Sequence, residues 1–431
     1  PPVALNTYRY WMIVHIVTAL FLVAFAAEHS GTSESRTTLS FDQALGLSSE
    51  GVAIRSVRDA AAVKAKLNQQ IARVNQNPTI QFQAGPRLLP EKNREPEIVL
   101  QILQPWTGGG YLQARRSSAM HEHSLLDARA RAIALGQKLD VAHLWLQLAT
   151  AQRELEVLHR MLSIAEALSL RIERTRQVGA AIEIDVREMQ ARTAEIAIQV
   201  VETEGTVHDL SLELSRRLGW SPTGHIETVG ELPLAPVPGH AARDGYVQRA
   251  AALPEARASL MQAQANRAQA VEQKSQYGWS FAFGVNVERD APGGLILSGI
   301  VQATPPLFEK GERYRGTTEA AAIEGAGHAV TASLAAQNAV ALAFHEVEHS
   351  GELADLIATR LLPTAVQVWT LRRKQFELGG ATVLDTLRSQ QTMLAAELRH
   401  TSASTQHAWA RVKLWLLLLA IEDGSASKDM R

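Results

Sequence analysis

The stretch that decides the fold is WSFAFGVNVE, residues 279–288, in which large apolar side chains alternate with small or polar ones. Successive side chains of a strand point to opposite faces of its sheet. One face of this strand would therefore carry Trp279, Phe281, Phe283, Val285 and Val287. A lipid-facing apolar side and a lumen-facing polar side are typical of a strand in an outer-membrane β-barrel. The alternative is a soluble β-sandwich, but no other part of the chain supplies its second sheet.

The chain repeats one pattern at a spacing of about 200 residues. Each copy predicts two strands, a very long helix, a tight reversal and a second long helix. The matching positions of the two copies are Gln104-Pro105-Trp106 and Pro305-Pro306-Leu307, Gly110 and Gly311, Leu162 and Leu362, Ala165 and Ala365, Gly179 and Gly379, and Asp185 and Asp385. This duplication restricts the function more than any single residue does.

The first copy covers residues 39–219 and opens with the capping-box spacing of Ser40 and Gln43. Its predicted elements are a helix from Ser40 to about Arg73, strands at 79–84 and 97–104, and long helices at 111–178 and 183–218. The first long helix would measure about 100 Å at ~1.5 Å per residue. Apolar residues recur in it at alternating steps of four and three, which predicts left-handed supercoiling against a neighbouring helix.

A Pro-rich linker at 220–250 leads into the second copy, residues 251–421. The predicted elements of this copy are a helix ending at Tyr277, strands at 279–288 and 295–304, and long helices at 312–378 and 382–421. Pro363 predicts a kink in the first long helix, because proline removes a backbone hydrogen bond. Residues 422–431 are predicted to form a polar tail.

Composition narrows the class of protein. The 431 residues contain 43 Lys and Arg against 44 Asp and Glu, so the chain lacks the basic surplus of a nucleic-acid-binding protein. The sequence has no Cys, which excludes disulfides, thiolate zinc sites and a lipidated cysteine. Residues 1–26 are expected to be a secretory signal peptide, because the apolar run from Met12 contains a small-x-small site at Ala24-Phe25-Ala26. An uncleaved membrane anchor is the alternative.

The strands and helices together predict an assembly of several chains. Four strands are too few to close a barrel, and strands in a membrane must close because lipid cannot satisfy a free edge. We therefore expect several copies to contribute four strands each. Their long helices, which lack a globular core of their own, would pack side by side into a second, helical tube. The expected fold class is mainly α with a small β part.

This arrangement resembles the TolC-like outer-membrane efflux channels, and it looks most similar to the outer-membrane component of cobalt-zinc-cadmium type cation efflux systems. The resemblance covers residues 39–420. The motifs that carry it are Leu39-Ser40-Phe41-Asp42-Gln43-Ala44-Leu45, Gln104-Pro105 with Gly109-Gly110, Thr304-Pro305-Pro306-Leu307-Phe308, Gly179 with Asp185-Val186, and Gly379 with Leu384-Asp385-Thr386-Leu387. Two features depart from the family: Tyr111-Leu112 stand where a basic residue is common, and there is no cysteine to carry a lipid anchor.

The resemblance implies a homotrimer with a 12-strand transmembrane β-barrel in the outer membrane, continued by an α-helical barrel into the periplasm. Such a protein is a passive exit duct, not an enzyme, and holds no cofactor or metal of its own. Its partners would be a periplasmic adaptor, an inner-membrane pump of the RND type and outer-membrane lipid. The subtype points to divalent heavy-metal cations as cargo, and drug efflux or type I protein secretion is the alternative.

The two helix reversals would be the periplasmic tips, where relatives close their tunnel. The resemblance places a tip acid at Asp385, and Arg388 stands where a second acid is usual, so a ring of three copies would have mixed sign. Asp185 has the same offset in the first copy, and Gly179 and Gly379 would shape the reversals. The alternative for Asp385 is local: it fits a first-turn acid beside an N-cap.

The motif His345-Glu346-Val347-Glu348-His349 matches the zinc-peptidase pattern of two His at i and i+4 with a Glu between them. A secreted zinc peptidase using His345, Glu346 and His349 is therefore a remote alternative. The motif lies within a long Ala-rich helix without a surrounding domain, so we expect a solvated helix face. His121 and His123 are two residues apart and would point away from each other on a helix.

Overall fold

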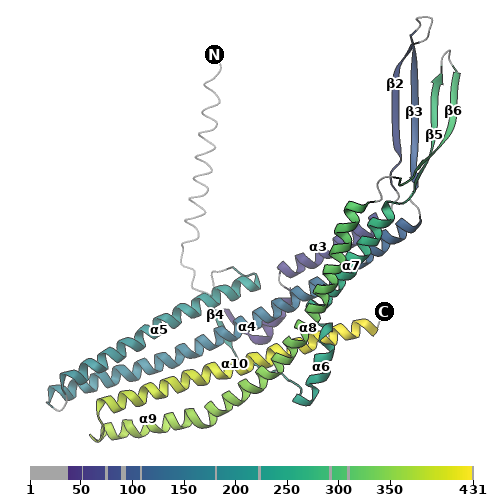
Figure 1. Cartoon of the computed structure of the whole chain (residues 1–431). Coiled ribbons are helices and arrows are strands. Elements are labelled where there is room, and N and C mark those ends of the chain that lie inside the picture. The colour runs from purple at the N-terminus through teal and green to yellow at the C-terminus, as the bar shows by residue number, and fades with distance from the viewer. Residues whose placement is uncertain are drawn as a thin grey trace, which may run out of the picture.

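The computed structural model describes residues 37–50, 52–72, 76–88, 94–106, 109–179, 182–221, 225–290, 294–307 and 311–429. The molecule is a long rod of helices that carries a narrow four-stranded sheet at one end (Figure 1). The signal peptide expected at residues 1–26 lies outside the described residues. No helix in the described ranges is both long enough and apolar enough to cross a membrane.

The first copy contains a short strand, two short helices, two long strands and two long helices. They are β1 (Thr37–Ser40), α2 (Phe41–Glu50), α3 (Val52–Ile71), β2 (Thr79–Leu88), β3 (Arg94–Trp106), α4 (Gly109–Gln177) and α5 (Glu183–Leu218). The capping box at Ser40 is present: its backbone N–H donates to Gln43 Oε1 at 3.0 Å, and the Gln43 N–H donates to Ser40 Oγ at 3.3 Å. The single helix expected up to Arg73 is instead two helices.

The second copy repeats the order of strand pair and helical hairpin. Its elements are η2 (Ala250–Ala252), α7 (Pro254–Gln276), β5 (Ser280–Asp290), β6 (Gly294–Thr304), α8 (Glu312–Leu356), η3 (Ile357–Leu361), α9 (Leu362–Glu377) and α10 (Val383–Asp429). Between the copies lie β4 (Ile226–Val229), η1 (His240–Ala242) and α6 (Arg243–Arg249). The linker expected at 220–250 thus contains a strand and short helices. The tail expected at 422–431 is largely a continuation of α10.

The long helix expected at 312–378 is interrupted by η3, a π-helical turn that ends two residues before Pro363. A proline in a helix lacks a donor, and its ring clashes with the carbonyl four residues earlier. The wider π turn accommodates both effects, and such turns are common places for a helix to bend. Proline therefore produces the expected kink, but the distortion lies on its N-terminal side. Figure 1 shows α8 and α9 running in different directions.

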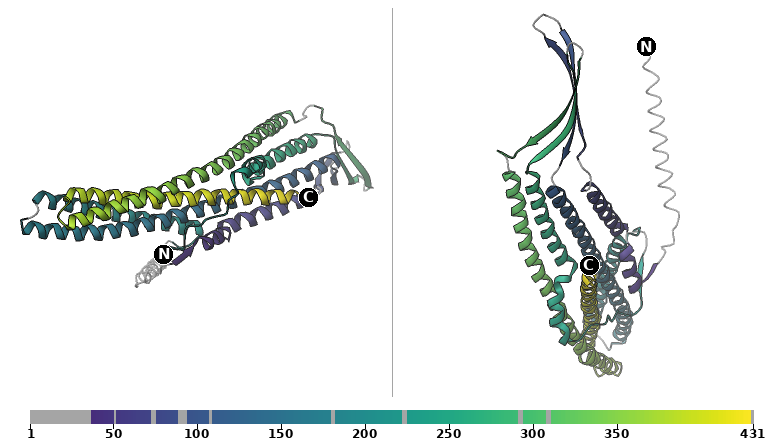
Figure 2. Two further views of the ribbon diagram at one scale, coloured as in Figure 1. Left: turned by 90° about the horizontal axis from the view of Figure 1, so that it is seen from below. Right: turned by 90° about the vertical axis from the view of Figure 1, so that its right-hand side faces the viewer.

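The four long strands form one antiparallel sheet in the order β2-β3-β5-β6. β2 and β3 are longer than the predicted strands at 79–84 and 97–104, because the ladder continues beyond them through the pair Pro86 and Pro96. β5 begins at Ser280, so Trp279 lies just outside the strand. Both views in Figure 2 show the sheet as a single layer that projects beyond the helices.

The helices near the sheet lie side by side in the same order as the strands to which they connect: α3, α4, α7 and α8. At the far end the order is α5, α4, α10 and α9. α3 and α5 therefore form one edge of the molecule, and α8 and α9 form the other. Each of the helices near the sheet directly precedes or follows one strand and keeps that strand's place in the side-to-side order. One lateral order therefore runs the full length of the rod (Figures 1 and 2).

The middle of the rod is held by a buried aromatic cluster. Trp145 on α4 is fully buried, and its indole N–H donates to the Leu39 carbonyl at 3.0 Å. The Phe41 ring meets it edge-on at a centroid distance of 5.4 Å. Gln152, two turns further along α4, donates to the Ile226 carbonyl and accepts from the Thr228 N–H, at 2.8 and 3.0 Å. These contacts fix the parallel β1–β4 pair against α4.

Candidate functional site

One face of the sheet is almost entirely apolar across all four strands. Residues opposite each other in an antiparallel ladder share a face, so the register assigns the members. This apolar face consists of Ile80, Phe82, Ala84, Ile98, Leu100, Ile102, Trp106, Phe281, Phe283, Val285, Val287, Leu295, Leu297, Val301 and Ala303. Gln104 and Arg289 are its polar members, near opposite ends of the sheet.

The apolar face is uncovered in the single chain. Phe82, Leu297 and Val301 are each 65% or more exposed, and no helix lies over the sheet (Figure 2). Water would make such a surface costly, at roughly 25 cal/mol per Å² of apolar area. The face therefore requires lipid or another apolar partner. The opposite face of the same sheet is richer in polar side chains, with Thr79, Gln81, Gln83, Glu97, Gln101, Asn286, Glu288, Ser298, Gln302 and Thr304. It also carries the apolar residues Val99, Leu103, Ile296 and Ile300.

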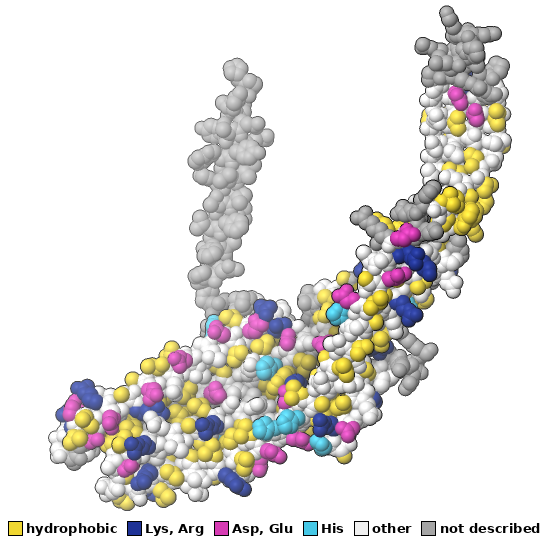
Figure 3. Space-filling view, viewed as in Figure 1, with side chains coloured by type: hydrophobic (Ala, Val, Ile, Leu, Met, Phe, Trp, Pro, Cys, Tyr) yellow, Lys and Arg dark blue, Asp and Glu magenta, His cyan; other side chains and the backbone are white. Residues whose placement is uncertain are grey.

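Aromatic rings gather where the sheet meets the helices. Trp279 stacks on Phe281 with ring centroids 6.0 Å apart, and Trp106 lies 6.0 Å from the same ring. Figure 3 shows hydrophobic side chains concentrated at this base of the sheet. Girdles of aromatic residues mark the interfaces of membrane barrels. Of the five residues expected to face lipid, Phe283 and Val285 are exposed, Phe281 and Val287 are half-buried, and Trp279 is exposed beside the strand.

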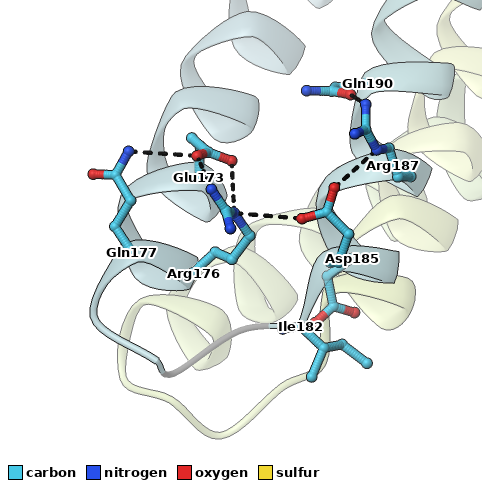
Figure 4. Close-up of polar contacts among 8 residues, drawn as sticks. Glu173, Arg176, Gln177, Ile182, Asp185, Arg187 and Gln190 are labelled. Carbon is cyan, nitrogen blue, oxygen red and sulfur yellow. Dashed lines mark hydrogen bonds and ion pairs between the residues drawn. The ribbon is translucent and has the colours of Figure 1, made fainter.

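The tip of the first hairpin is a chain of ion pairs between α4 and α5. Arg176 donates to Glu173 on its own helix at 2.7 Å and lies 3.6 Å from Glu183, which in turn pairs with Arg187 at 3.0 Å. Figure 4 shows these contacts. The hydrogen bond from Arg176 lowers the pKa of Glu173. Because Glu183 contacts Arg176 on α4 and Arg187 on α5, this row of ion pairs holds the ends of the two helices together at the reversal.

The two glycines at the reversals adopt the left-handed conformation expected of them. Gly179 has φ 78° and Gly379 has φ 79°. Both follow the last turn of a helix, where this conformation lets the backbone leave the helix. Asp185 Oδ2 accepts the Ile182 N–H at 3.3 Å, so Asp185 caps the start of α5.

The tip of the second hairpin contains the expected local cap. The Thr382 hydroxyl donates to Asp385 Oδ2 at 2.8 Å and accepts the Asp385 N–H at 3.1 Å. The hydroxyl bond is the main reason that the pKa of Asp385 lies below its ordinary value, and the charges of Arg372 and Arg388 add to it. Arg388 is exposed, one turn further along α10. Asp385 is therefore held in place by Thr382 while its carboxylate stays charged.

Contacts between the two hairpins join their tips. Arg171 on α4 lies 3.8 Å from Glu377 on α9, and its guanidinium lies 5.9 Å from the centre of the Phe376 ring. Further from the tip, Arg160 on α4 pairs with Glu397 on α10 at 2.7 Å. Sequence reasoning missed these pairs, because partners about 200 residues apart leave no local signal. It also missed the exposed apolar residues at the tips, where Val178 and Leu378 are 79% and 88% exposed.

The motif at 345–349 does not form a peptidase site. Glu346, the residue that would act as base, accepts a hydrogen bond from Lys413 on α10 at 2.8 Å. Glu348 pairs with His240 at 2.5 Å. Within the described part of the chain, no group of three or more His, Asp or Glu side chains is placed to hold a metal. In the other histidine pair, Glu122 between His121 and His123 instead ties α3 to α4 through Lys64 and Asn68.

Comparison with known proteins gives matches among solved structures alone: no protein-family model and no curated protein sequence matches the chain. A membrane protein from Pseudomonas aeruginosa is 17% identical, with a TM-score of 0.73 over 88% of this chain and 90% of that one. The outer-membrane channel OprN is 16% identical, with a TM-score of 0.72 over 88% and 89%. CusC, which forms a transmembrane channel, is 13% identical, with a TM-score of 0.72 over 90% and 95%. The chain therefore has the fold of the TolC-type outer-membrane channels.

Proposed function

We propose that this chain is the outer-membrane exit duct of a tripartite efflux system, extending from the outer membrane into the periplasm. The observation that carries the proposal is the uncovered, almost entirely apolar face of the β2-β3-β5-β6 sheet, with a face much richer in polar side chains behind it. Lipid would cover the apolar face and water in the pore would meet the polar one. The shared fold with solved outer-membrane channels supports the same function.

Assembly follows from the edges of the single chain. The sheet ends in β2 on one side and β6 on the other, and both edges need a partner inside a membrane. β6 of one copy would pair with β2 of the next, α8 would pack beside α3, and α9 beside α5. These edges differ from each other, so copies join head to tail and close into a ring. Three copies of four strands give the 12-strand barrel implied by the resemblance.

The tips of the hairpins would form the periplasmic end of the duct. Asp385 from each copy would place a carboxylate near the axis, and Arg388 would set an opposite charge one turn away. Asp185 would lie beside this ring. Exposed apolar residues at the reversals, Val178, Ile182, Ile184 and Leu378, offer a surface for a periplasmic adaptor. The adaptor would connect the duct to an inner-membrane pump of the RND type.

The cargo that we propose is divalent heavy-metal cations, supplied by the pump. The duct itself performs no chemistry, so cargo choice would rest mainly with the pump. The three Asp385 carboxylates would attract cations to the tip, and the Arg388 charges one turn away would weaken that attraction. Replacing Asp385 by Asn should therefore lower the preference of the pore for cations over anions, measured as a shift of reversal potential in a salt gradient.

Cross-linking tests the assembly, and the absence of native cysteine makes it clean. Cysteines at Gln81 on β2 and Gln302 on β6 lie on opposite edges of one sheet, at least about 14 Å apart at ~4.8 Å per strand spacing. A short bifunctional thiol reagent should join them only between copies, giving dimers and trimers on a denaturing gel. The matched control places cysteines at Gln101 and Asn286, which face each other on neighbouring strands of one chain. Cross-linking of this control should give no dimers or trimers on the gel.

Bilayer conductance tests the duct directly. The purified protein should form pores in planar lipid bilayers, and the β2–β6 cross-linked species should keep them. A protein that gives the cross-linked ladder and no conductance would be a ring without a pore. A protein that gives neither would leave the uncovered sheet face without the role proposed for it, and would overturn the proposal.

A further inference from the structure

Two exposed histidines on α8 form a pair that the channel function does not use. His345 and His349 are one helical turn apart, and their rings lie nearly parallel, with centroids 6.0 Å apart and 11° between the planes. Residues at i and i+4 share a helix face, so both imidazoles can approach one ion. We propose that His345 and His349 bind one divalent transition-metal ion per chain on the exposed face of α8.

The acidic residues of the motif are paired with side chains from other segments. Glu346 is engaged by Lys413, and Glu348 by His240. Across the described residues, the one contact found for either imidazole is the stacking of His345 on His349. The pair is therefore available to an incoming ion without breaking a hydrogen bond or an ion pair. The same contacts separate the pair from hydrolytic chemistry, because Glu346, the base of the peptidase motif, is neutralised by Lys413.

The pair lies on the face of α8 that is exposed in the single chain. The packed face of α8 at this height buries Val340, Ala343, Phe344 and Ser350. His345 and His349 lie opposite this face, on a stripe with the exposed residues Leu342, Leu353 and Leu356. Figure 3 shows histidine side chains gathered at mid-height of the helical part. Because α8 is an edge helix, a neighbouring copy would lie near this stripe in the proposed ring, so the test uses the assembled protein.

The donor set selects the class of ion. Imidazole nitrogens favour Cu²⁺, Ni²⁺ and Zn²⁺ over Mg²⁺ and Ca²⁺, which prefer oxygen. Metal–nitrogen bonds of about 2.0–2.1 Å would bring one nitrogen of each ring to within about 4 Å of the other, so both exposed rings would turn toward the ion. Two protein ligands leave the other positions to water. The carboxylate of Glu352, exposed three residues after His349, adds negative charge beside the site.

Copper titration of the full-length detergent-solubilised protein tests the site. The wild-type protein should bind one Cu²⁺ per chain more tightly than any other equivalent, with a paramagnetic resonance spectrum showing nitrogen coupling. His345→Ala and His349→Ala should each weaken this equivalent at least 10-fold, since each leaves one ligand. The control replaces His121 and His123, two histidines whose spacing prevents chelation, and should leave it unchanged.

Each outcome decides the proposal. Weaker Cu²⁺ binding in the His345 and His349 variants but not in the control supports the site, provided that the thermal unfolding midpoint of these variants without metal matches that of the wild type. The absence of a tight equivalent in the wild type, or equal weakening in the control, overturns it. Metal-free conductance should be the same in all variants, so failure of the metal site leaves the proposed duct untouched. Loss of conductance with intact copper binding would count against the duct alone.

Discussion

Arg171 on α4 and Glu377 on α9 approach to 3.8 Å across the gap between the two helical hairpins, near their tips. The pair links the first copy of the repeat to the second at the end where the proposed duct would close. Phe376 lies beneath the guanidinium and adds a cation–π contact. The tips of one chain are thereby held together before any neighbouring copy is added.

Removing this link should ease the opening of the tips. Both side chains are substantially exposed, at 49% and 40%, so the pair is worth about 0.2–1 kcal/mol at low salt. Arg171→Ala should therefore raise the open probability about 1.4- to 5-fold in bilayer recordings, and the effect should fade in high salt. Arg174→Ala is the control, because no ion pair of Arg174 is found among the described residues. An equal effect of both variants would show that loss of charge, not of the link, is responsible.

The reversal at Gly379 should not tolerate a side chain. Its φ of 79° costs an L-residue about 1–2 kcal/mol. Gly379→Ala should lower the unfolding midpoint and disturb the tip. Gly136→Ala on α4 makes the same chemical change where φ is helical and space is open, and should instead stabilise by about 0.4–1 kcal/mol. Thermal unfolding of both variants measures the two shifts, which should have opposite signs.

Gly284 in β5 is required by close packing in the sheet. A Cβ at this position would overlap the carbonyl oxygen of Ile102 and crowd the Leu103 side chain on β3. Gly284→Ala should therefore cost about 1–3 kcal/mol and reduce the yield of folded protein. Gly299→Ala, on β6 with open space around it, should fold normally. The fraction that resists unfolding in detergent at room temperature compares the two, and equal yields would contradict the pairing of Gly284 with Leu103 in the β3–β5 ladder.

The stability that the Thr382–Asp385 cap contributes should fall at acidic pH. Because the folded pKa of Asp385 is below its ordinary value of about 3.9, its stabilising contribution is complete above that value and is lost as the pH falls through the folded pKa. Thr382→Val removes both hydrogen bonds and should return the pKa upward. The stability difference between wild type and variant should be constant from pH 7 to about 5 and shrink below about 4. A stability difference between wild type and variant that grows as the pH falls would contradict this prediction.

Elements defined by local signals could be predicted from the sequence. The helix at 183–218 has the predicted bounds. Gly179, which was expected to shape the reversal before it, adopts a positive φ after the end of α4. The capping box at Ser40 follows from side-chain spacing alone. The alternation in 279–288 predicted which side chains of β5 lie on its apolar face. The strand register then places apolar side chains of β2, β3 and β6 on the same face.

Elements that depend on distant partners could not be predicted. Pro86 and Pro96 lie outside the predicted strands at 79–84 and 97–104, yet they pair with each other in a two-stranded extension beyond the last β3–β5 pair. Pro363 indicated a kink but not the π turn that precedes it. The partner of Glu346 is Lys413, 67 positions away, and only the packing of α8 on α10 brings the two together. Because of that contact, Glu346, which the motif suggested as a base, is instead one partner of an ion pair.

The most direct test of the proposed duct is a cryo-electron microscopy reconstruction of the detergent-solubilised full-length protein. We expect a three-fold tube with a detergent belt around the strands, β6 of each copy paired with β2 of the next, and the tips of α4, α5, α9 and α10 at the far end. A monomer, or an assembly in which the apolar sheet face packs against protein and carries no belt, would contradict the proposal.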